Sequence, residues 1–160
     1  MKRSIIIAAA MLLFTGLMIA DNLTVDCGNQ VRISATPQTG YHFTKWSDGS
    51  TEPVRVISPA SDTILTAYFA INTYAITATG EFGTVTGGGT YEHGAVVTLT
   101  VTPDECYRFT GWSDGNTDNP RLVEVTAAAN YVAQFEIIRY NVTVKPEQEG
   151  QGTVTVVPNP

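Results

Sequence analysis

Apolar and polar residues alternate with a period of two along most of the chain after its first twenty residues. The clearest case is 95–102, where Val97, Leu99 and Val101 alternate with threonines. Such alternation places the apolar side chains on one face of a β-strand. The pattern predicts a strand that ends at Pro103, because proline cannot donate a hydrogen bond to a neighbouring strand.

Similar alternation predicts further short strands, separated by residues that favour turns. In the second half of the chain they cover 74–78, 84–86, 107–112, 122–125 and 131–137. The glycines at 87–89 predict a flexible turn, and Asp114-Gly115 predicts a tight turn whose glycine accommodates a positive φ. No stretch after residue 20 has the composition of an amphipathic helix. The expected fold class is therefore all-β, with mainly antiparallel strands.

An internal repeat organises these elements. Residues 40–49 (Gly-Tyr-His-Phe-Thr-Lys-Trp-Ser-Asp-Gly) match 106–115 (Cys-Tyr-Arg-Phe-Thr-Gly-Trp-Ser-Asp-Gly), at an offset of 66 residues. The match continues without a gap over 28–69 and 94–135. A fixed period of this length is typical of tandem modules. The chain is therefore predicted to contain tandem small antiparallel β modules of about 66 residues each.

We assign copy one to 21–71, copy two to 73–137 and the start of a third copy to 139–160. The third copy begins with Tyr140-Asn141-Val142-Thr143, which parallels Tyr74-Ala75-Ile76-Thr77. Copy one is expected to lack its opening hairpin and copy three to be truncated, so a longer parent protein is expected. A module of this size is marginally stable alone, and packing against neighbouring repeats of the same chain is expected to support it.

The first twenty residues have the layout of a secretory signal peptide. Lys2 and Arg3 precede an apolar run over 5–19, and Ala20 supplies a small residue at the expected cleavage point. A membrane anchor is the alternative, but spanning a bilayer takes about 20 apolar residues and this run is shorter. We therefore expect 1–20 to be a cleaved leader, the protein to be exported, and no membrane span to remain after cleavage.

Charge narrows the set of partners. Loss of Lys2 and Arg3 with the leader leaves seven basic and fifteen acidic residues, a net charge of −8. An acidic chain without a basic cluster is a poor partner for phosphate backbones, so nucleic-acid binding is not expected. The sequence contains no cofactor-binding motif, so no cofactor is predicted to bind.

The order of motifs in copy two is specific. Between residues 74 and 115 it runs Tyr-x-Ile-Thr, Gly-Thr-Val-Thr, Gly-x-x-Val-x-Leu-x-Val-Thr-Pro and Tyr-x-Phe-x-Gly-Trp-Ser-Asp-Gly. This order resembles the divergent internalin B-repeat family, also called the Listeria–Bacteroides repeat. Copy one carries only the second part of the pattern, with Lys45 where copy two has Gly111.

The resemblance implies an extracellular or cell-surface bacterial protein built from compact modules of β-grasp-like character. In such proteins, strings of modules act as structural spacers or as adhesive segments. The resemblance implies no enzyme activity, and it transfers no ligand-binding residue to this sequence.

The turn after each Phe-x-x-Trp segment carries the candidate interaction residues. They are Trp46, Asp48, Gly49, Trp112, Asp114 and Gly115. The indoles could stack on sugar rings, or they could anchor the turn in the core of the module. Buried indoles would favour a spacer. Exposed indoles beside a groove would favour a module that binds glycans, or host or cell-surface proteins.

No catalytic or metal-binding residue is predicted. His42 lies near Ser47 and Asp48, but Arg108 takes its place in copy two and no nucleophile-elbow pattern surrounds the serine. Alternating oxygen-bearing residues at 114–118 resemble the start of a calcium loop, but no bidentate carboxylate follows at the required spacing. A polar hairpin turn explains them.

Two cysteines stand outside the repeat pattern. Cys27 aligns with His93, and Cys106 aligns with Gly40. An exported protein can form disulfides, so a bridge between the two copies is compatible with the expected compartment. The sequence leaves open whether Cys27 and Cys106 approach each other.

Overall fold

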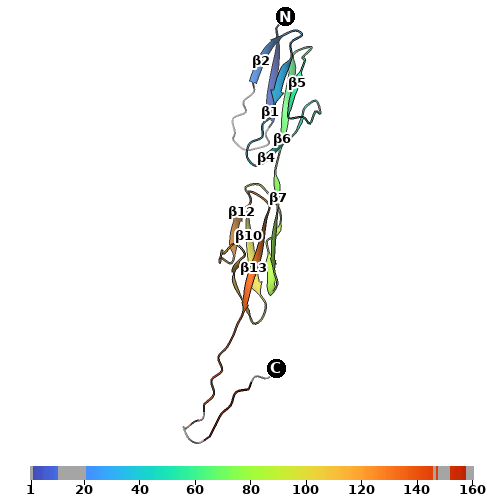
Figure 1. Cartoon of the computed structure of the whole chain (residues 1–160). Coiled ribbons are helices and arrows are strands. Elements are labelled where there is room, and N and C mark those ends of the chain that lie inside the picture. Colours follow the sequence, from blue (N-terminus) through green and yellow to red (C-terminus); the bar gives the residue numbers. More distant parts are fainter. Residues whose placement is uncertain (1, 11–20, 146, 148–151, 158–160) are drawn as a thin grey trace.

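The computed structural model describes residues 2–10, 21–145, 147 and 152–157. Every regular element in this part of the chain is a β-strand, and it contains no helix long and apolar enough to cross a membrane. The strands form two modules that lie end to end, followed by an extended C-terminal segment (Figure 1). The prediction of an all-β fold built from two small repeats is confirmed.

The two modules have closely related sets of strands. In module one they are β1 (Lys2–Ala10), β2 (Asp21–Asp26), β3 (Val31–Ser34), β4 (Tyr41–Trp46), β5 (Val54–Ile57) and β6 (Thr63–Ile71). In module two they are β7 (Thr73–Gly80), β8 (Gly83–Thr86), β9 (Gly89–Glu92), β10 (Val96–Pro103), β11 (Tyr107–Trp112), β12 (Arg121–Glu124) and β13 (Ala129–Ile137).

Module two consists of two sheets. One has the strand order β11-β13-β7-β9 and the other β12-β10-β8. Its first and last strands, β7 and β13, pair in parallel at the centre of the larger sheet, whereas the other pairings are antiparallel. This parallel pair of first and last strands gives the module its β-grasp-like character.

The core of module two lies between these sheets. Val97, Leu99 and Val101 of β10 are buried, as the alternation along this strand predicted. They meet Ile76 of β7 and Trp112 of β11 from the opposite sheet. Full burial of one such aliphatic side chain stabilises a fold by about 1.5–3 kcal/mol, so this layer accounts for much of the cohesion of the module.

Module one repeats this arrangement with the sheet orders β2-β1-β6-β4 and β3-β5. β1 and β6 pair in parallel, as β7 and β13 do. Even the bulges correspond: the register shifts between Phe43 and Lys45 in module one and between Phe109 and Gly111 in module two. The 66-residue repeat of the sequence is therefore a repeat of backbone geometry.

β1 takes the place in module one that β7 takes in module two. It is an inner strand, parallel to β6 and antiparallel to β2. The sequence analysis predicts that copy one lacks its opening hairpin and that 1–20 is a leader. Residues 1 and 11–20 of that leader lie outside the described residues, and its cleavage remains a prediction. Three consecutive isoleucines at 5–7 favour the strand conformation of β1, because β-branched residues are enriched in strands.

β9 is a strand that the sequence did not predict. The glycines at 87–89 indicated a turn, since glycine is depleted in strands. In the structure Gly89 begins β9, and Gly89–Glu92 pair with the start of β7. The hydroxyl of Tyr91 donates a 2.9 Å hydrogen bond to the carbonyl of Gly87, which fixes the turn before the strand.

Candidate functional site

A tight turn follows the tryptophan that ends β4 and β11. Gly49 and Gly115 have φ values of 90° and 85°, a region that favours glycine. Their amides donate hydrogen bonds of 2.9 and 2.8 Å to the carbonyls of Trp46 and Trp112. The turn predicted at Asp114-Gly115 is therefore present in both copies, with the same hydrogen bond.

Both tryptophans of this turn are fully buried, at 0% exposure. The indole nitrogen of Trp46 donates a 2.8 Å hydrogen bond to the carbonyl of Glu52, and that of Trp112 donates a 2.9 Å bond to the carbonyl of Asp118. The ring of Trp112 also meets the ring of Phe109 edge to face, with centroids 5.6 Å apart. The indoles thus join the turn to the core, and neither offers a face on which a sugar could stack.

The aspartates of the turn are paired with arginines. Asp114 accepts two hydrogen bonds from Arg121, of 2.8 and 2.6 Å, in a bidentate ion pair. Asp48 forms the equivalent pair with Arg55. Hydrogen bonding to the arginine is the main reason why the pKa of each carboxyl lies below its ordinary value, and a backbone amide two residues later contributes. The same pairing raises the pKa of Arg121.

The serines of the turn bond to the last strand of their module. The hydroxyl of Ser47 accepts a 3.1 Å hydrogen bond from the amide of Thr66, and the Ser47 amide donates a 2.8 Å bond to the Thr66 carbonyl. Ser113 makes the same two contacts with Val132. The amide and the hydroxyl of each serine therefore make their hydrogen bonds within the module.

The residues considered for catalysis are not assembled. Ser47 bonds β6, Asp48 pairs with Arg55, and His42 makes its hydrogen bond to the side chain of Asn72, at 2.8 Å. No hydrogen bond between His42 and either Ser47 or Asp48 is present. This grouping has none of the mutual geometry of a hydrolytic triad.

The oxygen-bearing residues after Trp112 form successive side-chain turns. Asp114 accepts a 3.2 Å bond from the amide of Asn116, and Asn116 accepts a 2.9 Å bond from the amide of Asp118. Within the described residues, no three His, Cys, Asp or Glu side chains gather where they could hold a metal ion. The loop is a polar hairpin turn whose side chains accept hydrogen bonds from its own backbone amides.

The second candidate site is the junction between the modules, which we define by Gly40, Asn72 and His93. Asn72 is the single residue between β6 and β7. Its amide donates a 2.8 Å bond to the carbonyl of Gly40, and its carbonyl accepts a 2.8 Å bond from the amide of His93. A Cβ placed on Gly40 would lie 2.2 Å from Cδ2 of His93, so the two modules are in close contact here.

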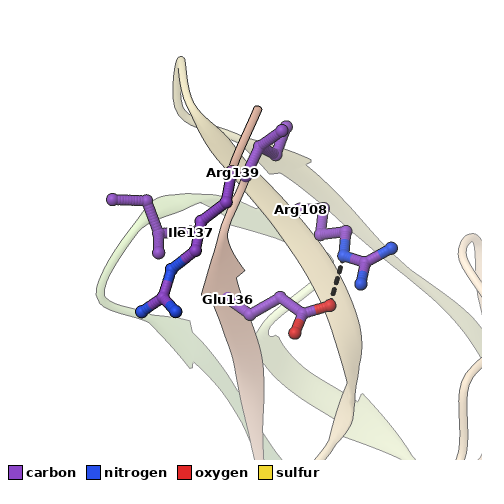
Figure 2. A pocket seen from close by; sticks show the side chains of 5 residues that line it. Arg108, Glu136, Ile137 and Arg139 are labelled. Carbon is purple, nitrogen blue, oxygen red and sulfur yellow. Dashed lines mark ion pairs between the residues drawn. The ribbon is translucent and has the colours of Figure 1, made fainter. Parts of the chain in front are cut away.

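The surface of module two that corresponds to the Gly40 side of the junction lies at the far end of module two, where a pocket opens to solvent. Arg108, Glu136, Ile137, Ile138 and Arg139 line it, and Arg108 and Glu136 form an ion pair across it (Figure 2). The amide of Ile138 donates a 2.7 Å bond to the carbonyl of Cys106, as Asn72 does to Gly40. Ile137 is 51% exposed here, whereas its counterpart Ile71 is partly covered at the junction. We call this surface the end face.

The two cysteines are free and exposed. Cys27 follows β2 at the outer end of module one, where Asp26 pairs with Lys2. Cys106 precedes β11 on the end face of module two, where Tyr107 pairs with Ile137. They lie at opposite ends of the two-module array, so the structure contains no disulfide between the two copies.

The sequence analysis did not identify the junction residues as a site. Their signal was present in the alignment of the two copies. Gly40 aligns with Cys106 in copy two, and His93 aligns with Cys27 in copy one. At both positions one copy has a cysteine and the other does not. Only the structure gives this difference its meaning, because it places Gly40 and His93 in contact.

Comparison with known protein families gave a match to most of the chain. A model described as the divergent InlB B-repeat domain matches residues 15–73 and 74–139. The boundary between the two matches falls between Thr73 and Tyr74, one residue into β7. Comparisons with curated proteins and with solved structures gave no match.

Proposed function

The chain belongs to the divergent InlB B-repeat family, a family of bacterial repeat modules, and from this membership we propose that it acts as a non-catalytic spacer. In this proposal the modules are exported and form a stiff segment of a cell-surface or secreted protein. The segment holds the other parts of that protein at a fixed separation.

The observation that carries the proposal is the one-residue connection through Asn72. β6 and β7 follow each other from Thr63 to Gly80 with Asn72 alone between them. At a rise of about 3.3 Å per residue, such a segment spans about 60 Å. The hydrogen bonds of Asn72 to Gly40 and His93 hold both sides of the connection, so the modules are not joined by a flexible linker.

The tryptophan turn supports a structural role. Its indoles are buried, its aspartates are paired with arginines and its serines are bonded to the neighbouring strand. Recognition of glycans through this turn would require an accessible indole face, which neither Trp46 nor Trp112 offers. The turn is therefore better suited to closing the module than to binding a ligand.

Export completes the proposal. The basic and then apolar composition of 1–20 supports a leader, and the acidic balance of the remaining chain suits a soluble module outside the cell. An adhesive role of the repeat surface is the finer alternative within the same location, and its test is binding of the intact chain to glycans or host proteins.

Small-angle X-ray scattering of the chain under reducing conditions tests the spacer function. We expect the pair-distance distribution of a stiff rod. Insertion of Gly-Gly-Ser after Asn72 should broaden this distribution and shift its mean to shorter distances, because the junction hydrogen bonds are lost. The matched control is the same insertion after Gly115, which lengthens an exposed turn and should leave the distribution unchanged. A native chain that scatters like the Asn72 insertion variant would show that the modules are flexibly joined, against the proposal.

A further inference from the structure

The junction inside the chain and the two outer ends of the chain carry corresponding positions. With the 66-residue offset, Gly40 corresponds to Cys106 and His93 corresponds to Cys27. At the junction Gly40 is buried and His93 is half-buried, whereas both cysteines are exposed. The two outer ends of the chain therefore correspond to the two surfaces that meet at the junction, but they are exposed to solvent.

The backbone at these positions is also equivalent. Gly40 has a φ of 83° and Cys106 a φ of 67°, which is uncommon for a residue with a side chain. The carbonyl of each accepts a hydrogen bond from the residue that follows the last strand, Asn72 at 2.8 Å or Ile138 at 2.7 Å. A module placed on the end face would therefore meet the backbone conformation that His93 faces at Gly40.

The spacing of the junction fits a disulfide. Cγ of His93 lies 2.7 Å from the Cβ position of Gly40, so the two Cβ positions are at most about 4.2 Å apart once the Cβ–Cγ bond is included. Cβ of His93 is not among the three nearest atoms, so it lies at least 2.9 Å away. Disulfides join Cβ atoms about 3.5–4.5 Å apart, an interval that this range overlaps. The junction combines a large residue with glycine, whereas the two outer ends carry one cysteine each. Two cysteines at these positions would be within bonding distance.

The C-terminal segment supplies the strand that such a contact needs. The stretch directly after β13 runs in extended form away from both modules (Figure 1), and Tyr140 and Val142 are 80% and 72% exposed. The sequence at 140–143 corresponds to the start of β7, and 152–155 corresponds to β8 after a three-residue insertion. Together these stretches carry the sequences of β7 and β8, the first strand of each sheet of module two.

Module one lacks an inner strand of its larger sheet once the leader is gone. β1 lies between β2 and β6, and its removal would leave the facing backbone groups of both strands without partners. Unpaired strand edges of this kind are templates for pairing with another chain. In module two the same inner position is filled by β7.

We propose that chains without residues 1–20 assemble head to tail, with 139–145 of one copy taking the position of β1 in the next copy and Cys106 forming a disulfide with Cys27 of that next copy. This inference rests on the export and leader removal of the proposed function. In this assembly a contact like the internal junction also forms between successive chains, and the chains together make a filament of modules.

The register of the internal junction also matches charges across the proposed contact. Thr73 is the cross-strand partner of Glu92. The corresponding residues are Arg139 of one copy and Asp26 of the next. Oppositely charged residues that face each other on neighbouring strands stabilise the pairing, so the register that joins the cysteines also joins an arginine to an aspartate.

The bond forms by thiol–disulfide exchange with a disulfide oxidant outside the cytoplasm, for which glutathione disulfide is the laboratory equivalent. The thiolate of Cys106 attacks the oxidant, forms a mixed disulfide and releases one thiol. The thiolate of Cys27 from the next copy then attacks the sulfur of Cys106 and releases the second thiol. Two thiols are oxidised to one disulfide, the oxidant is reduced to two thiols, and the two protons of the cysteines pass to the released groups.

The first experiment exports the full chain from a bacterial host and sequences its N-terminus. A chain that begins at Asp21 and is treated with glutathione disulfide should give a ladder of dimers, trimers and larger species on a non-reducing gel. Dithiothreitol should return the ladder to monomer, and mass spectrometry should find the Cys27 peptide joined to the Cys106 peptide. A chain that begins at Asp21 but remains monomeric overturns the inference and leaves the proposed export intact.

Retention of residues 1–20 by the exported chain would instead contradict the leader. In that case the same chain, with a protease site after Ala20, is cleaved and freed of its first twenty residues before oxidation. A ladder from this cleaved chain supports head-to-tail assembly without the export proposal, and a monomer overturns the assembly.

A mixing experiment separates the specific contact from collision of exposed thiols. Cys27→Ser and Cys106→Gly variants, both without residues 1–20, are oxidised separately and together. The mixture should give a heterodimer at least tenfold more abundant than either homodimer, because only the mixture contains both partners of the junction. Homodimers formed as readily as the heterodimer would overturn the proposal.

The strand is tested with two proline substitutions in the same extended segment. Val142→Pro removes a backbone donor within the proposed strand and should slow heterodimer formation at least tenfold. Val157→Pro lies in the same segment beyond the stretches that correspond to β7 and β8, and it should leave the rate unchanged. Equal rates for the two variants would show that 139–145 is not the docking strand, against the proposal.

Discussion

The indole nitrogen of Trp112 donates a 2.9 Å hydrogen bond to the backbone carbonyl of Asp118, six residues further along the chain. Trp46 and Glu52 repeat the bond in module one at 2.8 Å. Each loop is therefore closed by a ring that is at the same time the largest side chain of the core. This double use explains why the turn and the packing of the module depend on one residue.

Replacement of Trp112 by phenylalanine should destabilise module two by about 2–3 kcal/mol, because the hydrogen bond is lost and the smaller ring leaves a cavity. Hydrogen exchange of the β10 amides measures this opening free energy in module two alone. Leu122→Ala, at a residue that is 70% exposed, is the control and should change it by at most about 0.5 kcal/mol. Equal effects of the two substitutions would contradict the structural role of the indole.

Tryptophan fluorescence should report two enclosed indoles. We expect blue-shifted emission that acrylamide quenches poorly, and no change on addition of a glycan panel, because both rings are buried. Free tryptophan and the urea-unfolded chain provide the references for full accessibility. Strong quenching of the folded chain, together with a response to one class of glycan, would replace the spacer by a binding module.

Acid should weaken the turn. The pKa of Asp114 is lowered mainly by its hydrogen bond to Arg121, so the folded protein holds this proton less readily than the unfolded chain, in which the ordinary value is 3.8. The contribution of the pair to stability is complete above the unfolded pKa and is lost as the pH falls through the lower folded pKa. Asp48 acts in the same direction in module one.

Urea unfolding between about pH 6 and about pH 2 measures this effect. The free energy of unfolding should fall in the acid part of the range, and Asp114→Asn should flatten the fall. Glu105→Gln, at an exposed carboxylate outside the turn, is the matched control and should leave the slope as it is. A slope that does not change in Asp114→Asn would mean that the ion pair adds nothing to stability.

Cysteines engineered at the internal junction should form a disulfide. In a chain that carries Cys27→Ser and Cys106→Gly, the further pair Gly40→Cys and His93→Cys should oxidise to a bond within one chain. The expected geometry follows from the spacing of the two Cβ positions at the junction. Mass spectrometry after digestion would identify the bridged peptide.

The single substitutions Gly40→Cys and His93→Cys serve as controls and should give no intramolecular bond. Gly40→Cys alone should also be destabilising, because its Cβ would lie 2.2 Å from the ring of His93. If the double variant stays reduced under conditions that oxidise other paired cysteines, the junction does not have the geometry described here.

Much of the fold follows from alternation and from the 66-residue offset. The buried residues of β10 and the tight turn at Gly115 were predicted from local pattern, because strands and glycine turns are determined largely by residues close in sequence. β9 was missed because glycines obscured its pattern, and its pairing with β7 is a tertiary contact. The inner position of β1 was missed because the composition of a leader and that of a buried strand are both apolar.

Of the two candidate sites, the sequence identified the tryptophan turn but not the junction. The tryptophan turn was identified from its repetition, but the choice between stacking and packing required the burial of Trp46 and Trp112. The junction was not identified, because the contact between Gly40 and His93 joins positions whose residue types differ from their counterparts in the other copy. Repeat alignment finds what is shared, whereas this contact depends on what is not shared.

The parallel pairing of β7 and β13 has a mechanical consequence. The chain enters module two at Thr73, the start of β7, and leaves it at Ile137, the end of β13. Since the two strands run in the same direction, tension on the chain pulls them past each other along their length. The hydrogen bonds between Ile76–Gly80 and Ala129–Ala133 are then loaded together and not one after another. A module connected in this way resists stretching by force, which suits a segment that is pulled at both ends.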